Sequence, residues 1–136
     1  MSMNAEITRL LDRLAEAWNE GDATAYAAVF TDAADYITFD GTHLQGRAEI
    51  ESSHRWLFDG PLKGSTMSIG GNAAVKPLGE GAALVVSGGG TALADGPHRD
   101  SIVTFTAVGT PEGWRFASFQ NTRRVQGTRP RSGGAA

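Results

Sequence analysis

The sequence predicts an α+β fold, in which three N-terminal helices cover one face of a strongly curved, mainly antiparallel sheet. Helical periodicity of the apolar residues is confined to the chain before Gly60-Pro61. From Thr66 onward, four long β-type runs follow one another with only short turns between them, which favours antiparallel pairing. Helices first and strands afterwards is an element order typical of α+β folds.

The first predicted helix ends at Gly21, a residue that suits the end of a helix. Asp22 directly behind it suits the N-cap of a second helix. The apolar residues of the first helix recur at helical spacing and form one stripe: Ile7, Leu10, Leu11, Leu14 and Trp18.

The second predicted helix is short, with Tyr26, Val29 and Phe30 as its apolar stripe. A strand over residues 35–39 and a turn at Asp40-Gly41 are expected behind it. This strand is the only one predicted between the helices.

A third helix follows Gly46 and ends before Gly60-Pro61; its inward stripe consists of Ile50, His54, Leu57 and Phe58. Four predicted strands then complete the fold: 66–78, 82–94, 98–108 and 114–125. Gly70-Gly71 and the glycines at 88–90 lie inside these runs, where glycine often marks a bulge or a bend. A sheet bent around the helices would leave a conical space between the two layers, and we expect a ligand there.

Length and composition indicate one domain over residues 1–125, followed by a tail at 126–136 that we expect to be disordered. The formal net charge of -3 argues against a nucleic-acid partner. No apolar run approaches the roughly 18 residues of a membrane span, and the N-terminus does not resemble a signal peptide. With no cysteine in the chain, the expectation is a soluble cytoplasmic protein without a membrane partner.

His54 is the sharpest single candidate for chemistry, because helical spacing from Ile50 and Leu57 places it on the inward stripe. A histidine there could act as a general acid/base or donate a hydrogen bond to a ligand. It could equally be a core residue satisfied by a backbone carbonyl.

Other candidates are aromatic or acidic. Tyr26 carries a hydroxyl that needs a partner if it is buried, and Trp18 is a residue of the core or of a cavity wall. Arg99 and Asp100 are neighbours on a strand and point to opposite faces, so they form no close pair. No phosphate loop, dinucleotide motif or metal-ligand spacing is present, so neither a cofactor nor a metal is expected.

Four short motifs in this order resemble the SnoaL-like, SgcJ/EcaC-type branch of the nuclear transport factor 2-like superfamily: Ala17-Trp18-Asn19-Glu20-Gly21-Asp22, Gly46-Arg47, Ser53-His54-Arg55-Trp56-Leu57-Phe58 and Phe119-Gln120-Asn121-Thr122-Arg123. The resemblance covers about residues 4–125. It implies a cone-shaped α+β barrel and a homodimer packed through the sheets.

The chain also resembles the association domain of calcium/calmodulin-dependent kinase. That resemblance implies that Tyr26, His54, Phe119 and Asn121 line a pocket. Asn121 replaces an arginine of that domain, so carboxylate binding at this point is in doubt, and Arg123 is the alternative cationic group.

The catalytic carboxylates of related enzymes have no clear counterpart. Steroid isomerases of the superfamily use an aspartate on the first strand, where this chain has Tyr36, Thr38 and, at the end, Asp40. Limonene epoxide hydrolases use an Asp-Arg-Asp constellation that Arg99-Asp100 does not match in spacing.

Three functions therefore remain open. The first is a cyclase- or isomerase-like enzyme for a polyketide-like or other apolar substrate. His54 would be its acid/base, Tyr26 and Asn121 would polarise an oxygen, and the walls would be Trp18, Phe30, Phe39, Phe58 and Phe119. The second is a non-catalytic module that binds a small apolar or aromatic molecule or assists a pathway protein. The third is a structural dimer whose cavity its own side chains fill.

The closing strand at 114–125 is expected to contribute both to the pocket and to the contact with a second copy. Strand alternation together with the resemblance predicts that Ala117, Phe119, Asn121 and Arg123 face the cone. Gln120 and Thr122 would then face the outer surface, where a second copy would pack.

Overall fold

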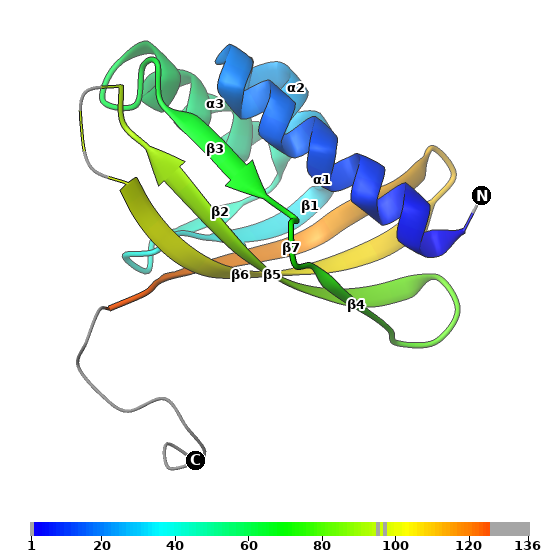
Figure 1. The fold of residues 1–136 in the computed structure, drawn as a ribbon. Helices are drawn as coiled ribbons and strands as arrows, with labels where there is room; N and C mark the ends of the chain where they lie inside the picture. The colour runs from blue at the N-terminus through cyan, green and yellow to red at the C-terminus, as the bar shows by residue number, and fades with distance from the viewer. Residues whose placement is uncertain (1, 95, 97, 126–136) are drawn as a thin grey trace.

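The computed structural model describes residues 2–94, 96 and 98–125, and the tail predicted at 126–136 lies outside the described residues. Three helices, α1 (Met3–Glu20), α2 (Ala23–Ala28) and α3 (Arg47–Asp59), lie on one side of a curved sheet (Figure 1). The strands are β1 (Phe30–Ile37), β2 (His43–Gln45), β3 (Thr66–Ile69), β4 (Ala74–Pro77), β5 (Ala82–Ala92), β6 (His98–Thr110) and β7 (Gly113–Arg123). The predicted α+β fold is confirmed.

Local hydrogen bonds explain the helix boundaries. Gly21 has the left-handed φ of 68°, and the N–H groups of Gly21 and Asp22 donate to the carbonyls of Trp18 and Ala17. The Asp22 carboxylate then accepts from Ala25 N–H at 3.0 Å and caps α2. The predicted end of the first helix and the predicted cap of the second are both confirmed.

The predicted second helix is too long. Phe30 is the first residue of β1, because Phe116 N–H donates to the Val29 carbonyl at 2.8 Å and Phe30 pairs with Phe116 of β7. The backbone N–H and C=O groups that would bond within a longer helix therefore form hydrogen bonds within the sheet instead. The first strand accordingly covers Phe30–Ile37, not residues 35–39.

Within residues 2–94, 96 and 98–125 the sheet contains seven strands, where the sequence predicted five. Their order is β2-β1-β7-β6-β5-β3, with β4 on β5, and the β1–β7 pair is the parallel one. The predicted run at 66–78 is broken at Gly70, whose φ is 89°, and β3 and β4 then pair with opposite halves of β5. In contrast, β5 passes through the glycines at 88–90 without a register shift against β6.

A β-bulge at Ala117 interrupts the closing strand. Thr106 of β6 pairs with Ser118, whereas the next residue, Ala107, pairs with Phe116. Ala117 has no partner in the ladder, and Phe116 takes the buried position that alternation from Phe119 gives to Ala117. The regular alternation from which Ala117 was predicted to face the cone is therefore interrupted at this residue.

The core lies between the helices and the inner face of the sheet. Its largest fully buried side chains include Tyr26, Phe30, Phe105 and Phe116. The Phe105 and Phe116 rings lie 4.2 Å apart between centroids, and both belong to central strands. Within the described residues, no helix is both long enough and apolar enough to cross a membrane.

Candidate functional site

An open pocket of about 430 Å³ lies between α3, the β1–β2 turn and the inner face of β5, β6 and β7. Its wall is mainly aromatic and aliphatic, with Trp18, Tyr36, Phe39, Trp56 and Phe119 as the large rings. The polar groups on the wall include His54, Ser53, Asn121 and Arg99. A mostly apolar hollow with a few polar groups is the usual form of a small-molecule site.

Two of the wall rings are held in place from behind. Trp18 comes from the last turn of α1, and its indole Nε1–H donates to Ser65 Oγ at 3.0 Å. Tyr36 comes from β1 and packs on Phe119 of β7 with ring centroids 4.4 Å apart. The pocket wall is therefore an extension of the core.

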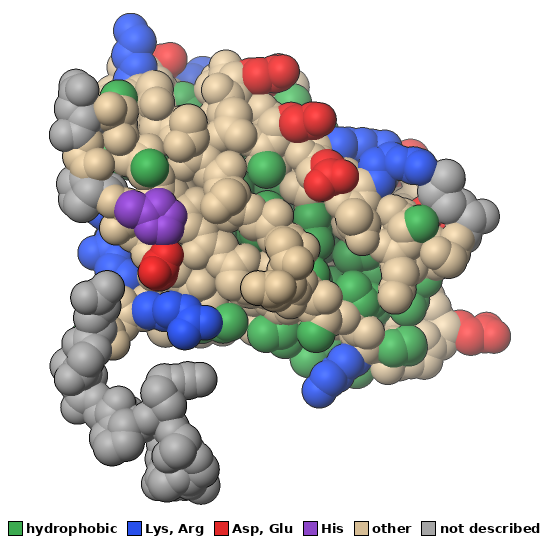
Figure 2. Space-filling model, viewed as in Figure 1, with side chains coloured by type: hydrophobic (Ala, Val, Ile, Leu, Met, Phe, Trp, Pro, Cys, Tyr) green, Lys and Arg blue, Asp and Glu red, His purple; other side chains and the backbone are tan. Residues whose placement is uncertain are grey.

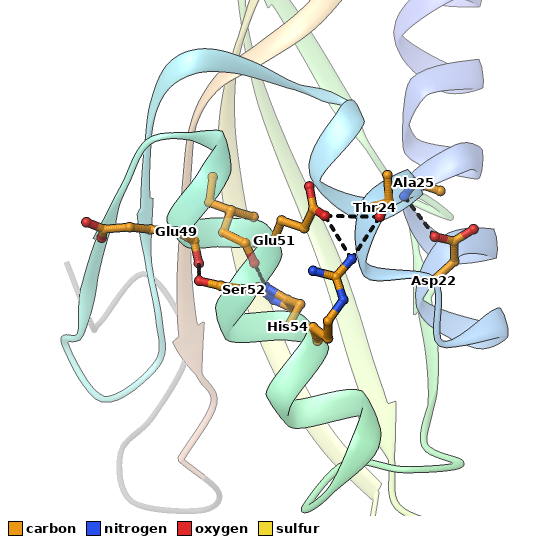
Figure 3. Close-up of polar contacts among 9 residues, drawn as sticks. Asp22, Thr24, Ala25, Glu49, Glu51, Ser52 and His54 are labelled. Atoms are coloured by element: carbon orange, nitrogen blue, oxygen red, sulfur yellow. Dashed lines mark hydrogen bonds and ion pairs between the residues drawn. The ribbon is translucent and has the colours of Figure 1, made fainter.

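A buried chain of hydrogen bonds lies beneath His54. Its Nδ1 is 2.7 Å from the Ile50 carbonyl oxygen, which only accepts, so Nδ1 carries a proton. Figure 3 shows the imidazole folded back along α3 to make this contact. Nε2 is 3.1 Å from the Tyr36 hydroxyl, which is 2.7 Å from the Tyr26 hydroxyl.

The protonation of this chain follows from burial. Desolvation lowers the pKa of His54 to about 4, although the hydrogen bond to Ile50 favours the charged form. Burial also raises the pKa of both tyrosines above the usual range. At neutral pH all three groups are uncharged, so Tyr36 donates to His54 Nε2 and Tyr26 donates to Tyr36.

This direction of donation determines what His54 can do. The Nε2 lone pair, which a general base would use, already accepts the Tyr36 proton. His54 is also 2% exposed and surrounded by the rings of Trp18, Tyr26, Tyr36 and Phe58. The ground-state geometry is that of a satisfied buried histidine on a pocket wall.

The predicted site residues are only partly brought together. Trp18, Phe39, His54, Phe119 and Asn121 line the pocket. Tyr26, Phe30 and Phe58 are buried in the core and are absent from its lining, so Phe30 and Phe58 do not form the walls that the sequence suggested. The Tyr26 hydroxyl, which was expected to polarise an oxygen of the substrate, bonds to Tyr36 behind the wall. The Arg123 guanidinium lies 3.9 Å from the centre of the Phe39 ring and lines a neighbouring hollow.

The amide of Asn121 is unusual among the lining groups. Its Oδ1 is buried and has no hydrogen-bond partner within the described part of the chain. Because buried polar atoms are nearly always paired, an unpaired one on a pocket wall indicates hydrogen-bonding capacity that is available to a ligand.

Tyr36 is the residue that sequence reasoning missed. It stood out only as a mismatch to a catalytic aspartate, yet it connects Tyr26 to His54. The signal in the sequence was the short alternation Ala34-Asp35-Tyr36, and the structure buries Ala34 and Tyr36 and exposes Asp35. Among the described residues, no group of three histidine or acidic side chains is arranged to hold a metal ion.

Comparison with known proteins gives a family. A family model described as a SnoaL-like domain matches residues 1–120. No curated protein matches the sequence.

Solved structures share the fold. A domain of unknown function with a cystatin-like fold from Nostoc punctiforme has a TM-score of 0.84 and 29% identity, covering 93% of this chain and 81% of its own. A putative calcium/calmodulin-dependent protein kinase II association domain from Xanthomonas campestris has a TM-score of 0.79 and 15% identity, with coverages of 93% and 91%. A ketosteroid isomerase-like protein from Erwinia carotovora atroseptica has a TM-score of 0.72 and 18% identity, with coverages of 89% and 95%.

Proposed function

Because this chain belongs to the SnoaL-like domain family, we propose that it binds a small, largely apolar or aromatic molecule in the pocket beside α3. The observation that supports this function best is the open hollow of about 430 Å³, whose lining includes Asn121 with a buried amide oxygen that has no partner among the described residues. Apolar walls supply affinity, and the few polar groups orient the ligand.

A blocked pocket tests the proposal. Ser53 of α3 lines the pocket, whereas the adjacent Ser52 is exposed and bonds only to the Glu49 carbonyl (Figure 3). Ser53→Phe is expected to weaken binding of the neutral aromatic probe N-phenyl-1-naphthylamine by about tenfold or more, because the new ring occupies ligand volume. Fluorescence titration measures the affinity, with Ser52→Phe as the matched control.

The control variant is expected to bind the probe as the wild type does. Equal affinities of Ser53→Phe and the wild type would show that the probe does not use this hollow. Circular dichroism of both variants checks that the added ring has not unfolded α3.

Catalysis through His54 is the alternative function, as a cyclisation or isomerisation of an apolar substrate. It is favoured by one observation, that His54 and Tyr36 line the same pocket and share a hydrogen bond. In that role the substrate would give a proton to the Tyr36 hydroxyl oxygen while the hydroxyl's own proton moves to His54 Nε2. The reverse transfers would then return a proton to another atom of the substrate and leave both residues neutral. Turnover of candidate aromatic polyketides by the wild type and by His54→Gln tests this, and equal rates would exclude the role.

A homodimer through the outer face of the sheet is part of the proposal. On this face, Leu84 and Val86 of β5 lie opposite Thr106 and Thr104 of β6, and all four side chains are half-buried in the single chain. Charged side chains are absent from these positions, as expected for the centre of an interface.

A charge at the centre of this face is expected to separate the subunits. Light scattering after size exclusion should give about twice the 14.3 kDa chain mass for the wild type and the single mass for Thr104→Glu. Ser52→Glu on exposed α3 is the control that keeps the dimer. A wild type with the mass of one chain would contradict the proposal.

A further inference from the structure

The inner face of β6 and β7 changes in polarity along its length. Alternate residues of a strand share a face, so the register of the two strands gives the opposed residues on the inner side. These opposed pairs, from the core outward, are Phe105–Phe119, Val103–Asn121 and Ser101–Arg123. Arg99 continues the same face beyond Ser101 and lines the pocket. The face therefore passes from aromatic, through amide and hydroxyl, to guanidinium groups.

The guanidinium end of this gradient lies where the pocket meets a second hollow. Arg99 lines both the pocket and an adjoining hollow of about 500 Å³, which Arg123 and Arg124 also line. Figure 2 shows basic, acidic and histidine side chains gathered over the start of β6 and the end of β7. Because Arg99 lines both hollows, a molecule in the pocket can extend past Arg99 toward the arginines at the end of the sheet.

Arg123 is positioned by an aromatic ring and not by a carboxylate. Its guanidinium stacks on Phe39, a 48% exposed residue of the pocket wall. Stacking on a ring face leaves the N–H groups at the guanidinium edge directed outward. Among the described residues, neither Arg123 nor Arg99 belongs to an ion pair.

The nearby carboxylates are already engaged. Asp40, at the pocket wall, accepts hydrogen bonds from Thr38 and Thr42. Asp100 lies 3.2 Å from the His98 imidazole. Two arginines at the outer end of an apolar pocket thus have donors that are not taken up by these neighbours.

We propose that the ligand of this pocket is an amphiphilic anion, with an apolar or aromatic body on the inner wall and a carboxylate, sulfonate or phosphate group at Arg99 and Arg123. The inference rests on the proposed binding function and specifies the chemical class of the ligand. Planar guanidinium groups bind such oxyanions through paired N–H donors. The Asn121 amide, midway along the gradient, is placed to bind a polar substituent of the body.

Two probes with the same aromatic body test binding of the apolar body and binding of the anionic group separately. 8-Anilinonaphthalene-1-sulfonate carries a sulfonate, and N-phenyl-1-naphthylamine lacks it. We expect the wild type to bind the sulfonate probe about tenfold more tightly, an advantage that falls as salt is added. Fluorescence titrations at low and high salt measure both affinities.

Arginine variants identify the anion-binding groups. Arg99→Gln/Arg123→Gln is expected to lose about tenfold in its preference for the sulfonate probe over the neutral probe. Because both arginines contact the pocket wall, the neutral-probe affinity of the same variant corrects for any change in the wall itself. Arg9→Gln/Arg13→Gln, which removes the same two charges from exposed positions on α1, is the control and should change neither affinity.

The possible results distinguish the proposed anionic ligand class from the proposed binding of a small molecule in the pocket. Equal binding of the two probes by the wild type, or an unchanged preference for the sulfonate probe in Arg99→Gln/Arg123→Gln, would overturn the anionic ligand class. Binding of the neutral probe that Ser53→Phe weakens would still support the pocket. Failure of the wild type to bind either probe would contradict both proposals.

Discussion

Lowering the pH from 7 to 4 is expected to reduce the free energy of unfolding by about 3 kcal/mol through His54 alone. Burial lowers the pKa of His54 from the ordinary 6.5 to about 4 in the folded protein. Between these two values the unfolded chain binds a proton that the folded chain does not. His54 therefore contributes its full stabilisation above pH 6.5 and loses it as the pH falls through 4.

Urea unfolding at a series of pH values measures this effect. His54→Gln should be less stable at neutral pH and should show a flatter pH dependence between 6.5 and 4. Ser52→Gln, which adds no titratable group at an exposed position of the same helix, is the control and should keep the wild-type slope. An NMR titration of the wild type is an independent check, since protonation of His54 near pH 6.5 would contradict the prediction.

Tyr36→Phe is expected to reduce the free energy of unfolding by about 2–4 kcal/mol, and Tyr26→Phe by only about 1 kcal/mol. The Tyr36 hydroxyl serves two neighbours, so its removal leaves both the Tyr26 hydroxyl and His54 Nε2 buried without partners. Removal of the Tyr26 hydroxyl leaves the Tyr36–His54 bond in place. Each variant lacks one hydroxyl oxygen. The difference between the two losses in free energy of unfolding therefore reflects where each hydroxyl lies in the chain of hydrogen bonds.

The double variant Tyr26→Phe/Tyr36→Phe sharpens this comparison. It leaves only His54 Nε2 without a partner, so its loss should be smaller than the sum of the two single losses. Denaturant unfolding at neutral pH gives all three values. Equal losses for the two single variants would contradict the central position of Tyr36 between Tyr26 and His54.

Features set by local chemistry could be predicted from the sequence. The boundary between α1 and α2 depends on Gly21 and Asp22, which act within one turn of the chain. The inward position of His54 follows from helical spacing and is confirmed by its burial. The glycines inside the strand runs indicated a bent sheet, and the family resemblance added the likeness to a kinase association domain.

Features that depend on residues far apart in the sequence could not be predicted from the sequence. Phe30 fits a helical stripe, but it is drawn into β1 by pairing with Phe116, more than eighty residues away in the sequence. The split of the 66–78 run at Gly70 depends on which half of β5 each piece meets. Tyr36 matters through hydrogen bonds to two other elements, which strand propensity does not encode.

The bulge at Ala117 has a consequence for the chain's tolerance of length changes. Even-numbered residues of β7 face the helices before Ala117, as Phe116 does, and odd-numbered residues face them after it, as Phe119 and Asn121 do. A strand usually cannot lose one residue, because every side chain beyond the deletion changes face. Here the deletion of Ala117 would remove the bulge, so that the alternation of inward and outward side chains would be continuous along one regular strand. Phe116 would remain in the core and Asn121 in the pocket wall.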